Sequence, residues 1–186
     1  MSEQEQPALE VSGQQLESVQ AETVVLNQSA AQRVDASSVV AQTSPIGSVQ
    51  AETLTMEASA AGLAQAASAD VRQAVIGAAV VEDAALHLTA AGAVLARHDV
   101  HVESSLVETV AATGDVWIER SFSGTTLVGG NATISNTYTV FLLAGGGIQA
   151  EGEVHTVFDP ESARSFGLAF GAVVGIFWLL RLLFRR

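Results

Sequence analysis

The 186-residue chain contains no cysteine and no lysine. Without cysteine, the chain has no disulfides, thiolate nucleophiles or cysteine-based zinc sites. Eight arginines oppose twenty acidic residues, for a net charge of −12. Because nucleic-acid binding depends on basic side chains that neutralise phosphates, no nucleic-acid partner is expected. Prolines number only three and aromatic residues make up 5%, whereas 48% of residues are apolar. This composition indicates an ordered, acidic protein rich in alanine and valine.

The charge is divided unevenly along the chain. Residues 1–161 hold all twenty acids and four arginines, which gives −16, whereas residues 162–186 hold four arginines and no acid, which gives +4. The two parts therefore face different surroundings. We divide the chain into a polar arm (1–8), a repeat domain (9–158) and a carboxy-terminal helix (159–186).

The repeat domain shows an internal period. The segment Val-Gln-Ala-Glu-Thr occurs at 19–23 and again at 49–53, and half of that spacing reveals a finer repeat. An apolar-x-apolar pair recurs ten times at steps of 15 or 16, at Leu9/Val11, Val24/Leu26, Val39/Ala41, Leu54/Met56, Ala69/Val71, Ala84/Leu86, Val100/Val102, Val116/Ile118, Ala132/Ile134 and Ile148/Ala150. A small hydroxyl residue follows most pairs after five positions, at Ser29, Ser44, Ser59, Thr89, Ser105, Ser121 and Thr137.

This period predicts an all-β fold, a parallel β-solenoid. Side chains alternate between the two faces of a strand, so each pair buries two residues and exposes the one between them. Fifteen residues cannot bury a face alone, but ten stacked turns, each with three short sides, would form a rod of about 45–50 Å at about 4.8 Å per turn. The alternative is that segments such as Ala58 to Ala69 form helices, since they are rich in helix formers. Ten in-register pairs favour the solenoid.

One column of the predicted stack lies between the paired residues and should face outward. It places Val25 beside Val40 as an apolar strip, and His101 beside Trp117 as an aromatic spot. Exposed apolar and aromatic groups are typical of partner surfaces. These four residues are candidates for a protein contact, and the alternative is that they are ordinary surface residues.

A second column, just before each pair, places three carboxylates one turn apart, at Asp83, Asp99 and Asp115. Hard cations bind oxygen ligands, so these are weak metal candidates, and a solvated ladder of turn residues is the favoured alternative. In the column after the pairs, Arg72 lies one turn from Glu57, which predicts a cross-strand ion pair.

The sequence offers no convincing active site, and we expect neither enzymatic activity nor a cofactor. His98 and His101 could be metal ligands, but no further ligand at a defined spacing accompanies them. They are interpreted as surface histidines.

The carboxy-terminal segment reads as a single transmembrane helix. Asp159, Pro160 and Glu161 form a helix start, and residues 166–184 contain one charge, Arg181. Nineteen residues at about 1.5 Å each cover about 28 Å, which matches a bilayer core. The residues expected at the membrane interface are Trp178, Arg181, Arg185 and Arg186. A buried core helix is the alternative.

Three glycines four residues apart, Gly167, Gly171 and Gly175, would let two such helices approach closely, so we expect a homo-oligomer. The alternative is that glycine is simply common in membrane helices. Because no signal peptide is visible and the anchor is terminal, we expect the solenoid to stay in the cytoplasm, held at the cell membrane. The arginines beyond the apolar segment favour the opposite orientation.

The stacked Val-x-Ala/Ile pairs over residues 9–158, with polar ends, resemble bactofilins. This family consists of bacterial cytoskeletal β-solenoids that polymerise end to end and attach to membranes. The chain departs from bactofilins in its few early glycines and its dedicated anchor. Its ending, from Val140 through Pro160, looks more like uncharacterised bacterial membrane-anchored repeat proteins. The resemblance implies a membrane-tethered structural protein, and an adaptor that recruits a soluble complex to the membrane is the alternative.

Overall fold

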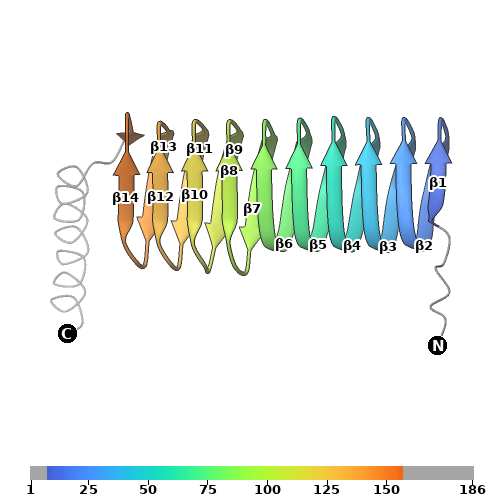
Figure 1. Ribbon diagram of the computed structural model, residues 1–186, viewed down its shortest axis with the longest axis horizontal. Coiled ribbons are helices and arrows are strands. Elements are labelled where there is room, and N and C mark those ends of the chain that lie inside the picture. Colours follow the sequence, from blue (N-terminus) through green and yellow to red (C-terminus); the bar gives the residue numbers. More distant parts are fainter. Residues whose placement is uncertain (1–7, 157–186) are drawn as a thin grey trace, which may run out of the picture.

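The computed structural model describes residues 8–156, and these residues form one stack of parallel strands (Figure 1). The strands are β1 (Leu9–Ser12), β2 (Gln15–Asn27), β3 (Ala30–Gln42), β4 (Pro45–Glu57), β5 (Ala60–Arg72), β6 (Val75–His87), β7 (Ala90–Ala96), β8 (Val100–Glu103), β9 (Leu106–Ala112), β10 (Val116–Glu119), β11 (Phe122–Val128), β12 (Ala132–Ser135), β13 (Tyr138–Ala144), β14 (Ile148–Glu151) and β15 (His155–Thr156). Each turn of the chain pairs with the turn before it and the turn after it. The predicted parallel β-solenoid of about ten turns is confirmed.

The predicted register is also confirmed. Leu9 pairs with Val24, and the same column continues turn by turn through Val116 to Ile148. Both members of most pairs are fully buried, as Val24 and Leu26 are. The paired residues therefore fill the interior of the rod.

Each turn has three sides. In the turn that begins at Ser44, the inward-facing pairs are Ser44 with Ile46, Val49 with Ala51, and Leu54 with Met56. The central outward residues are Pro45 on the first side, Gln50 on the second and Thr55 on the third. We call these sides A, B and C and apply the names to the equivalent residues of every turn.

Two successive outward-facing residues separate neighbouring sides, because the chain bends there. In the same turn these corners are Gly47–Ser48 between sides A and B (corner 1), Glu52–Thr53 between sides B and C (corner 2), and Glu57–Ala58 after side C (corner 3). The alternation of a strand is thus interrupted every five residues, which is how a 13-residue strand wraps around the rod.

Corner 2 lengthens by one residue in the carboxy-terminal half. β2 to β6 pass through it as unbroken strands, whereas later turns divide into two strands, as β7 and β8 do around Arg97–Asp99. The strand register shows that the repeat lengthens from 15 to 16 residues. Ala60 pairs with Val75, 15 positions on, whereas Ala84 pairs with Val100, 16 positions on. Figure 1 shows the resulting loops below β7 to β14. The extra residue lies outside the core, so the interior columns continue unchanged.

The second residue of corner 3 has a left-handed backbone conformation. Eight non-glycine residues have φ between 47° and 51°, namely Gln28, Thr43, Ala58, Gln73, Leu88, Ser104, Arg120 and Asn136. Their N–H groups each donate to a carbonyl of the next turn, as Gln28 does to Gln42 at 3.0 Å. The backbone ladder therefore continues through the tightest bend.

The predicted hydroxyl column lies directly after these left-handed residues and is buried. The Ser44 Oγ donates to the carbonyls of Gln42 (2.8 Å) and Leu26 (3.2 Å) and accepts the N–H of Ser29 (3.2 Å). Ala74 is the one residue without a hydroxyl between Ser29 and Thr137 in this column. Within residues 8–156, no buried side-chain nitrogen or oxygen lacks a hydrogen-bond partner.

The predicted membrane helix lies outside the described residues, together with Gly167, Gly171, Gly175, Trp178, Arg181, Arg185 and Arg186. A search of the described part of the chain for a helix that is long and apolar enough to span a bilayer finds none.

Candidate functional site

The outward column of side C contains all four residues expected to form a partner surface. Val25 pairs with Val40, and His101 pairs with Trp117, whose rings are stacked with centroids 6.5 Å apart. The two valines are half-buried, so they form a less exposed strip than expected. Three turns separate them from the aromatic pair, so the structure does not bring the four residues into one patch.

The three aspartates of corner 2 each accept a backbone hydrogen bond from the next turn. The Asp83 Oδ1 accepts the N–H of Asp99 (3.1 Å), the Asp99 Oδ1 accepts that of Asp115 (2.8 Å), and the Asp115 Oδ1 accepts that of Asn131 (2.7 Å). The side chains thereby bond backbone groups at the lengthened corner. Among residues 8–156, no group of three or more His, Asp or Glu is placed to hold a metal ion. The geometry supports the turn-ladder interpretation.

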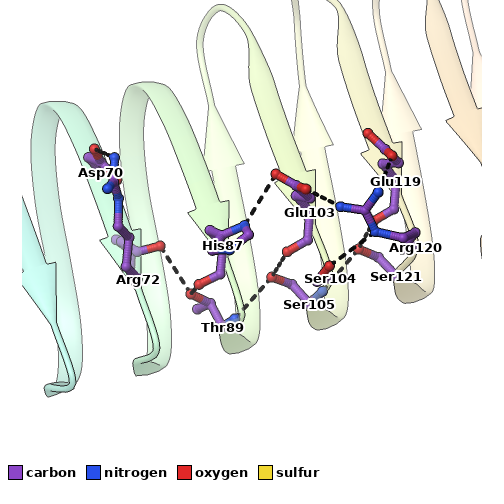
Figure 2. Close-up of polar contacts among 11 residues, drawn as sticks. Asp70, Arg72, His87, Thr89, Glu103, Ser104, Ser105, Glu119, Arg120 and Ser121 are labelled. Atoms are coloured by element: carbon purple, nitrogen blue, oxygen red, sulfur yellow. Dashed lines mark hydrogen bonds and ion pairs between the residues drawn. The ribbon is translucent and has the colours of Figure 1, made fainter.

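Arg72 has a different partner from the one expected. Its guanidinium forms two hydrogen bonds with Asp70, two residues back on the same strand, with Nη2 3.0 Å from Oδ2 (Figure 2). The hydrogen bond and the charge of Asp70 hold the pKa of Arg72 above its ordinary value, and Glu57 contributes least. The expected pair with Glu57 is therefore replaced by a pair within one strand, because residues two apart project from the same face.

Polar side-chain contacts link successive turns along corner 3 (Figure 2). The His87 Nδ1 lies 3.2 Å from the Glu103 Oε2, while Arg120 contacts both Glu103 and the Glu119 Oε1, the latter at 2.6 Å. All of these side chains are partly or largely exposed. Exposed pairs of this kind contribute little to stability, so they mainly determine where charge lies on the rod.

The charged contacts at corner 2 are looser. The His98 Nδ1 lies 3.6 Å from the Asp83 Oδ2, and the Arg97 Nη1 lies 3.7 Å from the Glu82 Oε1. His98 and His101 face different surroundings, since His98 approaches a carboxylate and His101 stacks on Trp117. The two histidines that the sequence offers as metal ligands therefore have different partners.

Sequence reasoning followed the outward column of side C and missed those of sides A and B. The side B column changes from polar to apolar at about the middle of the rod and ends in Leu127 and Leu143, while the side A column gains large apolar residues from Val75 onward. Reading the sequence every 15 or 16 residues from Gln50 would have revealed this change.

No protein-family model, no curated protein and no solved structure matches this chain. The resemblance to bactofilins therefore stays a prediction, and a proposal about function depends on the geometry of the rod.

Proposed function

We propose that the protein is a non-enzymatic, membrane-tethered β-solenoid that acts as a structural or assembly element and polymerises through the ends of its rod. The observation that carries the proposal is the exposed interior at both ends. Ile148 occupies the inward column of Val116 and Ala132, which are each 1% exposed, yet it is itself 53% exposed. At the other end Leu9, in the same column, is 43% exposed.

Two such ends are complementary. Within residues 8–156, β1 and β14 each pair with a strand on one side only, and open strand edges template the pairing of further strands. A second rod stacked end to end would extend the parallel ladder and cover the exposed apolar residues, as neighbouring turns do within one rod. The acidic residues at corners 2 and 3 would limit lateral association at those corners.

The proposed tether is the apolar segment 166–184, with Trp178, Arg181, Arg185 and Arg186 at the interface and the solenoid in the cytoplasm. Gly167, Gly171 and Gly175 would promote association of the helices. Gly171→Ile should then weaken self-association in detergent, and an unchanged oligomer size would contradict this part of the proposal.

Negative-stain microscopy of the protein without residues 165–186 tests polymerisation. We expect filaments from the native rod and short single rods from Ile148→Asp, which puts a charge on the exposed apolar end. Gln149→Asp is the matched control, because the neighbouring side chain belongs to an outward column, and it should leave the filaments intact. Dispersed short rods from the native ends would refute end-to-end assembly.

The aromatic pair on side C favours a second candidate function, that of a membrane adaptor. Trp117 is 37% exposed and stacks on His101, and exposed tryptophans are enriched among residues that dominate protein interfaces. A pull-down with native protein and with Trp117→Ala tests this. A partner set unaffected by the substitution would exclude Trp117 as the contact.

A further inference from the structure

The carboxy-terminal half of the rod has an apolar ridge formed by side A, corner 1 and side B. The central column of side A contains Val75, Ala90, Leu106, Phe122 and Tyr138, and that of side B contains Val80, Leu95, Ala111, Leu127 and Leu143. Val75 and Leu143 are each 59% exposed, and Phe122 stacks on Tyr138 with ring centroids 5.3 Å apart. Large apolar side chains thus point into solvent over five successive turns.

The amino-terminal half differs most on side B, since its side A column (Gln15, Ala30, Pro45 and Ala60) holds small residues but only one polar one. Its side B column reads Gln20, Asp35, Gln50 and Gln65, each paired with its neighbour along the stack. The side A and side B strands of the later turns (75–81, 90–96, 106–112, 122–128 and 138–144) contain one charged residue, Glu108 at corner 1. The other charges of residues 75–156 lie at corners 2 and 3, around side C. This half of the rod is therefore amphipathic about its long axis.

We propose that this ridge lies in the interfacial region of the bilayer, so that the tethered rod rests on the membrane along its carboxy-terminal half. This inference rests on the proposed membrane tether. β15 pairs with β13 at Tyr138 and His155, on side A, so the described part of the chain ends beside the ridge. The nine residues 157–165 that precede the apolar segment reach at most about 30 Å when extended. A tail in the bilayer therefore keeps the last turns near its surface.

The shape of the ridge favours lipid over a second rod. Two sheets associate by packing flat faces together, but sides A and B diverge from corner 1, so one flat face cannot cover both. A single side spans five residues at about 3.3 Å and five turns at about 4.8 Å, so it offers an area of roughly 300–400 Å², which is small beside the roughly 800 Å² per partner of a stable protein interface. A fluid interface can surround both sides of a ridge, as it does the apolar face of an interfacial helix.

Site-specific labelling of the full-length protein in phosphatidylcholine vesicles tests the inference, since the chain has no cysteine. An environment-sensitive fluorophore is attached to Leu127→Cys on the ridge. Thr133→Cys lies in the same turn on side C, and Gln50→Cys occupies the side B column in the polar half. We expect brominated lipids to quench the label at position 127 severalfold more than at either control position. Phe122→Cys, on side A, provides a second ridge position, and circular dichroism verifies the fold of each variant.

Three outcomes would overturn the inference. Equal quenching at the ridge and control positions means that the ridge does not contact lipid. A blue-shifted emission at position 127 without quenching by brominated lipid means that protein, either the tail or a second copy, covers the ridge. Flotation of the same vesicles separates the two proposals. Protein that floats without ridge quenching keeps the tether and rejects the ridge contact, whereas protein that does not float rejects both.

Discussion

The buried hydroxyl column makes the sharpest prediction about what stabilises the stack. Ser44 is 1% exposed, and its Oγ accepts the N–H of Ser29 at 3.2 Å. In Ser44→Ala that N–H is left in the interior without this partner. The Gln42 carbonyl is less affected, because it also accepts the N–H of Gln28. An unsatisfied buried donor costs about 1–3 kcal/mol, so we expect the free energy of unfolding to fall by about 2 kcal/mol.

Ala74 allows the opposite experiment. It interrupts the column between Ser59 and Thr89 and is 4% exposed. The equivalent position one turn on holds the larger Thr89, so a serine should fit. In Ala74→Ser the new hydroxyl is placed to accept the N–H of Ser59, as the Ser59 Oγ accepts that of Ser44 at 3.1 Å. We expect a gain of about 0.5–1.5 kcal/mol, the net value of a typical hydrogen bond.

Urea titration in mild detergent, followed by far-ultraviolet circular dichroism, measures both changes. Native-state hydrogen exchange at the Ser29 amide adds a local readout, because repeat proteins can open turn by turn. The control is Ser37→Ala, the same substitution at an exposed position of β3, with an expected change within about 0.5 kcal/mol. If Ser44→Ala costs no more than this control, or if Ala74→Ser destabilises the protein, the stabilising role assigned to the column is refuted.

Three further substitutions test the corners by the same titration. Gly62→Ala places a Cβ 2.6 Å from the Gly47 carbonyl oxygen, so the backbone must shift and the free energy of unfolding should fall by about 1–3 kcal/mol. An unchanged free energy of unfolding would mean that corner 1 is loosely packed. Thr43→Gly removes the strain of a β-branched residue at φ 51°. Because glycine also increases the entropy of the unfolded chain, the free energy of unfolding should rise by only about 0.5–1 kcal/mol, and a decrease would contradict this. Arg72→Ala should leave the urea midpoint unchanged, because its pair with Asp70 is exposed. The raised pKa of Arg72 keeps it charged until strongly alkaline pH, so a difference that varied across the neutral range would point to another group.

The sequence was sufficient to predict the stack, because burial alternates with period two and the interior pairs recur at fixed steps. Both ends of the pair column, at Leu9 and Ile148, were placed in their observed register. The hydroxyl column was also found. Its hydrogen bonds were not predicted. The Ser44 hydroxyl bonds carbonyls two and eighteen residues back, and these contacts follow only from the geometry of the turn.

The corners were harder to predict, because local backbone geometry determines them. Non-glycine residues such as Thr43 and Leu88 give no sequence signal for a left-handed conformation. The partner of Arg72 was predicted wrongly because two acidic side chains lie within its reach, Glu57 on the previous turn and Asp70 on the same strand. The carboxylates of corner 2 were predicted to form a turn ladder, but their acceptance of backbone N–H groups, as by Asp83 and Asp99, could not be predicted without the geometry of the lengthened corner.

The two halves of the rod differ outside the core and agree within it. The apolar ridge begins at Val75 and the longer corner 2 begins at Arg97, about one turn later, while the interior column runs unbroken through Ala84 and Val100. An added corner residue or a changed outward side chain leaves the inward register intact, so the surface of a solenoid can diverge from turn to turn at little cost to packing. Functional differences along such a rod therefore belong to its outward columns. The ridge is spread over five distant segments of sequence, so it becomes visible only when the outward columns are followed one turn at a time, as the inward pairs were.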